Sequence, residues 1–159
     1  MLSRDRLLEV VSYDVGTGVM TWMAANKWRA GKKAGCIRKD GYIVIRIDGE
    51  LMYAHRLAWL YVYGAWPSDF IDHINGITGD NRICNLRDVP VAINSQNQRR
   101  ASRTNKASKL LGVQRNHGGW QAVITTAGKR RCLGTFPSPQ EAHAVYLTEK
   151  RKVHAGCTI

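Results

Sequence analysis

The stretch 71–98 contains, within a short length of chain, the residue types that metal-assisted hydrolysis needs. Asp72 and His73 are adjacent, Asn85 comes twelve residues after His73, and Asn94 comes nine residues after Asn85. Carboxylate and amide oxygens are ligands for a hard cation, and an imidazole titrates near neutral pH. The stretch could therefore supply one divalent metal and one general base.

Phosphodiester hydrolysis is the reaction that these groups suit. It requires a base for the attacking water and positive charge near the phosphorus and the leaving oxygen. Mg²⁺ supplies that charge with only one or two protein ligands, because it keeps several of its waters. We expect Asp72 and Asn94 to hold Mg²⁺, with Mn²⁺ as the alternative metal. His73 is the expected base, and Asn85 is expected to orient its imidazole by hydrogen bonding. Asn97 is the alternative to Asn94 as a ligand, because both lie on one face of a short expected helix.

The charge of the chain indicates a nucleic-acid partner. Its 159 residues include 24 Lys and Arg but only 12 Asp and Glu, which gives a formal net charge of +12. A surplus of this size in a small chain is typical of nucleic-acid binding. An acidic membrane surface would also attract it, but the longest apolar run, 58–63, is far shorter than the roughly 20 residues of a spanning helix. We expect double-stranded DNA as the partner, and no membrane association.

The cysteines and the N-terminus indicate a reduced, cytoplasmic protein. Cys36, Cys84, Cys132 and Cys157 form no CxxC pair and have no zinc-finger spacing to a histidine, so no structural zinc is expected. The first residues include acidic side chains and no small-residue cleavage site, so no signal peptide is expected. Reduced thiols follow from that compartment.

The spacing of His73, Asn85 and Asn94, with Leu86 directly after Asn85, resembles the HNH endonucleases. The surrounding phrases AHRLAWLYVYGAWP, IDHINGITGDNRICNLR and INSQN look like the subgroup found in phage and intron homing endonucleases. The resemblance implies a ββα-metal fold, in which a two-stranded ribbon carries Asp72 and His73 and a helix carries Asn94. It implies the same roles as above, with Asn85 as the structural middle residue. The last motif position is asparagine here and histidine in the family's usual motif, which favours Mg²⁺ or Mn²⁺ over zinc or nickel.

The C-terminal block resembles the ethylene-response-factor (Apetala-two) type of DNA-binding domain. The matching pieces are 112–113, 120–122, 133–136 and 141–146. The resemblance implies a three-stranded sheet in the major groove with a helix packed behind it. The candidate DNA contacts on that sheet are Gln114, Arg115, Asn116, Gln121, Thr125 and Arg130. Val123 and Cys132 replace contact residues of the plant family, so its base preference does not transfer. The expected inward residues are Trp120, Ala122, Ile124, Leu133 and Phe136.

Together these patterns predict an α+β chain with four parts. They are an N-terminal helix and β-hairpin extension (1–52), an HNH nuclease unit (53–99), a basic linker (100–109) and a three-stranded antiparallel sheet with a helix (110–159). Arg56, at the start of an expected helix, and Arg99, Arg100 and Arg103, at the start of the basic stretch, are candidate phosphate contacts. Solvated surface is the alternative for each.

The predicted function is a metal-dependent endonuclease that nicks or cleaves duplex DNA and is targeted by its C-terminal domain. The first alternative is a non-catalytic, sequence-specific DNA-binding regulator with a vestigial nuclease unit. An RNA-binding or packaging-accessory protein is a second alternative, which the charge permits and the motifs disfavour. The expected location is the cytoplasm, or the host cytoplasm for a phage-encoded protein. No dimer interface can be identified in the sequence, and a monomer is compatible with it.

Overall fold

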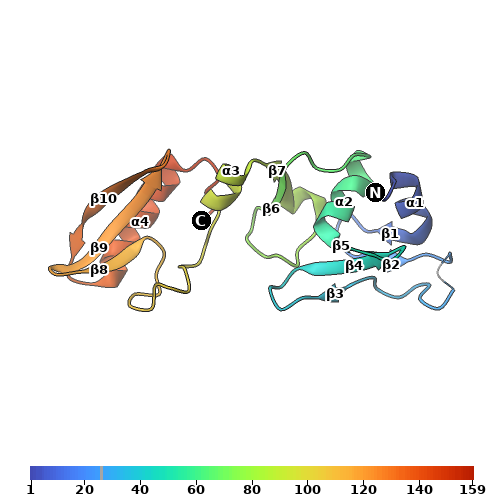
Figure 1. The fold of residues 1–159 in the computed structure, drawn as a ribbon, viewed down its shortest axis with the longest axis horizontal. Coiled ribbons are helices and arrows are strands. Elements are labelled where there is room, and N and C mark those ends of the chain that lie inside the picture. Colours follow the sequence, from blue (N-terminus) through green and yellow to red (C-terminus); the bar gives the residue numbers. More distant parts are fainter. Residues whose placement is uncertain (26) are drawn as a thin grey trace. The chain divides into compact units, whose positions relative to one another are not determined.

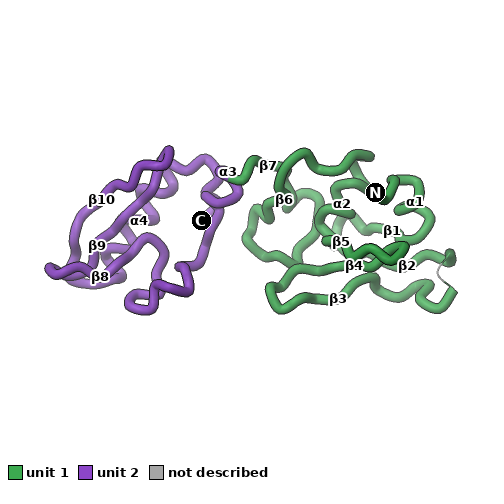
Figure 2. Tube along the Cα trace, viewed as in Figure 1, with its two compact units in different colours: residues 1–91 green, residues 92–159 purple. Residues whose placement is uncertain are grey.

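The structure is a computed structural model that describes residues 1–25 and 27–159. It divides into two compact units, Met1–Val91 and Ala92–Ile159, which Figure 2 shows in different colours. Each unit combines helices with antiparallel strands (Figure 1). The expected mixture of α and β elements is therefore confirmed.

The first unit begins with a helix and continues through short strands to the segment that carries the candidate chemistry. Its elements are α1 (Arg4–Val10), β1 (Val11–Tyr13), β2 (Met20–Trp22), β3 (Cys36–Ile37), β4 (Ile43–Ile47), β5 (Glu50–Tyr53), α2 (Ala54–Tyr63), β6 (Phe70–His73), the 3₁₀ turn η1 (Ile83–Asn85) and β7 (Leu86–Val89). Strands β1 and β2 pair, β3, β4 and β5 form a three-stranded sheet, and β6 pairs with β7.

Local sequence explains where several of these elements begin and end. Ser3 caps α1, because its hydroxyl accepts a hydrogen bond from the backbone N–H of Arg6 at 3.2 Å. The β4–β5 hairpin turns at Asp48 and Gly49, whose φ angles of 48° and 85° are those of a two-residue hairpin turn. Helix α2 ends at Gly64, which adopts a left-handed φ of 78°.

The core of the first unit holds α2 firmly in place. Leu57 and Ala58 of α2 are fully buried, as is Leu7 of α1, and Ile45 of β4 is 1% exposed. The buried positions of α2 recur with helical spacing and so form one apolar face. Each fully buried leucine contributes about 2 kcal/mol. This packing fixes the first turn of α2, where His55 lies.

The β6–β7 ribbon carries the candidate residues of the first unit. Its register places Asp72 opposite Arg87 and His73 opposite Leu86. In chain order the ribbon is followed by the short helix α3 (Val91–Gln96), so the sequence of two strands and a helix agrees with the expected ββα arrangement. Asp88, in β7, holds the start of β6 in place: its carboxylate accepts the backbone N–H groups of Ser68 (2.6 Å) and Asp69 (3.0 Å).

The second unit contains the three strands and the helix that the sequence pattern predicts in this block. They are β8 (Val113–Asn116), β9 (Gly119–Thr126), β10 (Lys129–Phe136) and α4 (Pro139–Val153), with β9 central in an antiparallel sheet. Ser138 and Glu141 form a capping box at the start of α4. The five expected inward residues all belong to the core between the sheet and α4. A Cβ on Gly112 would lie 2.0 Å from the ring of Tyr146, so only glycine fits there.

The basic stretch 100–109 is folded onto the second unit, whereas a free linker would be extended. The side-chain amide of Asn105 donates to the backbone oxygens of Leu110 (3.0 Å) and Val113 (2.7 Å). The hydroxyl of Ser108 also donates to Val113 O, at 3.0 Å. The division of the chain into four parts remains a prediction. The structure itself divides into two compact units, with the boundary after Val91. Among the described residues, no helix has both the length and the apolar character to cross a lipid bilayer.

Candidate active site

Asp72 is a buried carboxylate held by a neighbouring arginine. It is 6% exposed, and both Nε and Nη2 of Arg87 donate to its Oδ2, at 2.8 Å and 2.6 Å. The pairing of β6 with β7 makes these two residues direct cross-strand neighbours. A buried carboxylate needs such a partner, because an unpaired charge away from water is strongly destabilising. Arg87 therefore supplies the counter-charge to this carboxylate and holds it in one orientation.

His73 is buried next to Asp72, at 4% exposure, and its ring is fixed by Asn81. The His73 Nε2 atom lies 3.1 Å from Oδ1 of Asn81. An amide oxygen only accepts hydrogen bonds, so Nε2 carries the ring hydrogen and Nδ1 carries the lone pair. Burial lowers the pKa of His73 below its ordinary value, against the opposing effects of the Asn81 hydrogen bond and of Asp72 and Asp80. The imidazole is therefore neutral at physiological pH and can accept a proton.

An aromatic wall, formed by Tyr42, Tyr53 and His55, packs behind His73. The ring of His55 meets that of His73 edge to face, with centroids 5.2 Å apart, and stacks on Tyr53 at 5.2 Å. The ring of Tyr42 contacts both histidine rings, with centroid distances of 5.4 Å to His55 and 5.8 Å to His73. Burial, with smaller effects of His73 and Arg56, lowers the pKa of His55 to about 3. The wall is thus uncharged at neutral pH, and it adds no positive charge beside the candidate base.

Asn85 holds the loop between β6 and β7. Its Oδ1 accepts the backbone N–H of Asn75 (2.9 Å), and its Nδ2 donates to the backbone oxygen of Asp80 (2.8 Å). Asn81, at the end of that loop, makes the hydrogen bond to the imidazole, and Asn85 shapes the loop that presents it. A role for Asn85 in orienting the base stays a prediction.

Asn81 is a candidate site residue that the sequence pattern did not indicate. Its side chain is 1% exposed, and its backbone oxygen accepts a hydrogen bond from the hydroxyl of Tyr13 at 2.8 Å. A Cβ on Gly18 would lie 2.4 Å from the backbone nitrogen of Arg82. The β1–β2 hairpin therefore packs directly against the Asn81 backbone. No sequence signal joins Tyr13 to Asn81, because their contact depends on packing between distant segments.

Asn94 and Asn97 both lie in the second unit. Asn94 is half-buried on α3, and Asn97 is 6% exposed just beyond it. The hydroxyl of Thr158 donates to Oδ1 of Asn97. The amide oxygen of Asn97 is therefore engaged within the second unit.

The available donors suit a hard cation. Asp72 offers a carboxylate, and among the described residues no group of three or more His, Cys, Asp and Glu side chains lies close enough together to hold a metal. Mg²⁺ tolerates such a sparse set because it keeps its waters, whereas zinc needs three or four nitrogen or sulfur ligands. The carboxylate of Asp72 is thus a donor of the kind that Mg²⁺ or Mn²⁺ takes.

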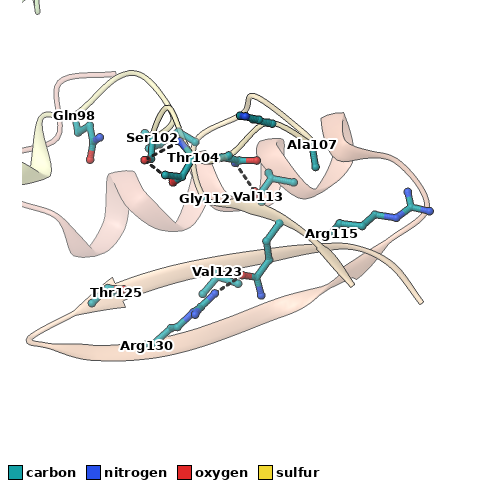
Figure 3. Close-up of a pocket in the computed structure, with 14 residues that line it drawn as sticks. Gln98, Ser102, Thr104, Ala107, Gly112, Val113, Arg115, Val123, Thr125 and Arg130 are labelled. Carbon is teal, nitrogen blue, oxygen red and sulfur yellow. Dashed lines mark hydrogen bonds between the residues drawn. The ribbon is translucent and has the colours of Figure 1, made fainter. Parts of the chain in front are cut away.

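The sheet of the second unit has a polar outer face, opposite α4. Gln114 and Gln121 are cross-strand neighbours joined by a side-chain hydrogen bond, and the guanidinium of Arg130 donates to Gln114. Thr125 pairs with Arg130 on the same face. A cavity of about 730 Å³ lies between this face and the stretch 98–107; Figure 3 shows Ser102 and Thr104 on the loop side, with Val123, Thr125 and Arg130 on the sheet side.

The other candidate DNA contacts do not all lie on this outer face of the sheet. Arg115 pairs in register with Trp120 and lies 4.9 Å over its ring, so it is on the opposite face from Gln114. Asn116 is exposed at the β8–β9 turn. Arg56 lies 5.8 Å over the ring of Trp66, and Nη2 of Arg99 donates to the hydroxyl of Thr158 at 2.6 Å. Two further arginines, Arg100 and Arg103, are exposed.

One protein family matches the segment that contains the candidate site residues. Residues 52–96 match the family model described as HNH endonuclease. The matched segment runs from the end of β5 to the end of α3 and contains Asp72, His73, Asn85 and Asn94, so the HNH resemblance is confirmed for these residues. The resemblance of the C-terminal block to an Apetala-two domain stays a prediction.

One solved structure that is similar to this chain is described as "DNA binding and cleavage by the HNH homing endonuclease I-HmuI". The identity is 22%, the TM-score is 0.46, and the similarity covers 92% of this chain and 88% of that chain. No curated protein sequence matches the chain significantly.

Proposed function

We propose that this protein is a metal-dependent endonuclease that hydrolyses phosphodiester bonds of duplex DNA. The observation that supports this most directly is the pair formed by Asp72 and His73. Both are buried, one is a fixed carboxylate and the other a neutral imidazole with an assigned lone pair, and they lie in the segment that matches the HNH endonucleases. The net charge of +12 supports a polyanionic substrate.

His73 is the proposed general base. Its Nδ1 takes a proton from a water molecule as the water oxygen forms a bond to phosphorus, and the bond from phosphorus to the leaving sugar oxygen breaks. That oxygen then takes a proton from solvent. Asn81 keeps the ring hydrogen on Nε2 throughout, so that Nδ1 is the accepting atom. A divalent cation held by Asp72 and Asn94 would stabilise the negative charge on the phosphate and the leaving oxygen.

Asn94 is the preferred second ligand for a reason beyond spacing. The alternative, Asn97, is 6% exposed, and its amide oxygen accepts a hydrogen bond from Thr158. One lone pair of that buried oxygen is therefore already engaged inside the second unit. Asn94 is half-buried on α3 and is the proposed ligand.

The second unit is the proposed targeting surface. Gln114, Gln121 and Arg130 offer amide and guanidinium groups, which pair well with base edges in the major groove. The exposed Arg100 and Arg103 would contact phosphates, which position the protein without reading sequence. Arg115 takes no part in base reading by this face, because it lies over Trp120 on the opposite side of the sheet.

A plasmid-nicking assay tests the proposed activity. Supercoiled plasmid is incubated with the protein and Mg²⁺ or Mn²⁺, with and without chelator. We expect metal-dependent nicking that His73→Ala reduces by at least ~10²-fold, the usual contribution of a general base. His117→Ala, at an exposed histidine in the β8–β9 turn, is the matched control and should retain activity. Wild-type protein that binds duplex DNA but leaves it intact with both metals would establish the non-catalytic regulator instead.

A further inference from the structure

Helix α3, which carries Asn94, is too short to be stable alone. It has six residues, Val91–Gln96, and none of them is fully buried. Isolated helices shorter than about 12–15 residues are marginal in water, so a helix of this length depends on tertiary contacts. Inside the second unit those contacts come from the end of α4 and from the chain beyond it.

The C-terminal segment, defined here as residues 154–159, runs from the sheet to α3. At one end, the His154 ring lies 3.0 Å from the backbone oxygen of Thr125 in β9. Further on, the backbone N–H of Gly156 donates to the side-chain oxygen of Gln96 at 2.9 Å. The hydroxyl of Thr158 donates to Asn97, and the segment is thereby joined to the last residue of α3 and to the residue that follows it.

Gly156 is the point of closest approach between the C-terminal segment and α3. It is buried, and a Cβ at this position would lie 2.3 Å from the backbone oxygen of Ile93 and 3.1 Å from Cβ of Gln96. Its backbone does not adopt a left-handed conformation, so the glycine is required here by space and not by φ. The absence of a side chain lets the two backbones touch next to Asn94.

Lys150 supports the same helix from α4. It is 1% exposed, and its Nζ donates to the backbone oxygen of Gln98 at 2.5 Å. A backbone carbonyl oxygen carries partial negative charge, and the ammonium group of Lys150 makes a charge-assisted hydrogen bond to it just beyond the end of α3. Burial lowers the pKa of Lys150, as expected for an ammonium group withdrawn from water. A buried lysine would be costly without this carbonyl partner.

We propose that the C-terminal segment, together with Lys150, is a positioning element for Asn94, the proposed second metal ligand. This inference rests on the proposed function, because that function assigns the metal-ligand role to Asn94. It gives the second unit two tasks, one toward DNA through the sheet and one toward catalysis through α3. The unit is then not a targeting module that can be removed while metal binding is kept.

Two pairs of variants of the full chain test the inference. Gly156→Ala inserts a methyl group against Ile93, and its control is Gly118→Ala, where a Cβ would meet only Cγ2 of Thr135 at 3.9 Å. Thr158→Val removes the hydroxyl that Asn97 and Arg99 share, and its control is Thr148→Val, whose hydroxyl bonds only within α4. The measurements are amide hydrogen exchange in α3, Mn²⁺ affinity by electron paramagnetic resonance, plasmid nicking and duplex affinity.

We expect Gly156→Ala and Thr158→Val to accelerate exchange in α3 and to lower Mn²⁺ affinity and nicking by about 10–100-fold, the usual effect of losing support behind a metal ligand. Duplex affinity should stay within about twofold, and both controls should match wild type. Unchanged α3 exchange in both test variants would overturn the inference, and so would full nicking by a variant in which α3 is released. If wild type neither nicks DNA nor binds Mn²⁺, the proposed function fails and the role of Asn94 fails with it, while the exchange comparison still decides whether this segment holds α3.

Discussion

The hydrogen bond between Nε2 of His73 and Oδ1 of Asn81 fixes which nitrogen of the imidazole can accept a proton. It also couples the pKa of the ring to the charge at position 81. A neutral amide stabilises the imidazolium only weakly, and burial dominates, so the pKa of His73 lies below its ordinary value. A carboxylate at the same distance would favour the charged ring much more strongly.

Two substitutions at Asn81 therefore separate orientation from charge. Asn81→Ala removes the contact and should lower nicking by about 10–100-fold at all pH values. Asn81→Asp keeps an acceptor but raises the pKa of His73, so the acid limb of the pH–rate profile should move to higher pH. The measurement is the nicking rate between pH 5 and 9 for the three proteins. An acid limb that stays where it is in Asn81→Asp would show that His73 is not the base.

Single residues also show what the sequence could and could not predict. Asp72 and His73 could be identified because their residue types and their spacing to Asn85 and Asn94 are visible in the sequence itself, and the family match includes both. Asn81 could not, since its role depends on Tyr13 and Gly18, more than sixty residues earlier in the chain. Asn85 could be singled out as important, but spacing alone could not distinguish a contact to the base from a contact to the loop behind it.

At the scale of elements, the β1–β2 hairpin supports the candidate site although it contributes no chemical group to it. Strands β1 and β2 are three residues each, and the turn between them presses on the backbone at Asn81 and Arg82. Sequence patterns gave this hairpin only the status of an N-terminal extension. Local signals such as the Ser138 capping box and the Asp48–Gly49 turn are readable because they act between near neighbours, whereas this contact is long-range.

Gly18 and Gly16 test that support within one turn. Gly18 has a φ of 72°, and a Cβ there would lie 2.4 Å from the nitrogen of Arg82, whereas a Cβ on Gly16 would meet only Oδ1 of Asp14 at 3.4 Å. Gly18→Ala should destabilise the first unit by about 1–3 kcal/mol, from backbone strain and overpacking, and should reduce nicking. Gly16→Ala should remain within ~0.5 kcal/mol of wild type. Urea unfolding measures the stability of both variants, and the plasmid assay measures their nicking. Equal stability and equal nicking in the two variants would show that the β1–β2 hairpin does not support the site.

At the scale of the whole molecule, the two units should respond differently to acid. The lowered histidine pKa values belong to His55 and His73, and both are in the first unit. In the unfolded chain these rings take up protons near pH 6.5, whereas in the folded unit they stay neutral to lower pH. Stability is therefore complete above pH 6.5 and is lost as the pH falls toward the folded values. For His55 this loss extends down to a pKa of about 3.

The magnitude can be estimated from His55 alone and tested by removing its titration. Each pKa unit corresponds to about 1.4 kcal/mol, so at pH 4 the folded first unit should have lost on the order of 3 kcal/mol. His55→Phe keeps an aromatic ring against Tyr53 and His73 and sacrifices no bond at Nδ1, which has no hydrogen-bond partner among the described residues. We expect this variant to unfold at lower pH than wild type, with amide signals of Met1–Val91 shifting their midpoint while those of Ala92–Ile159 keep theirs. The same acid midpoint in both proteins would mean that the buried ring of His55 is protonated without unfolding, and that the wall behind His73 can carry charge.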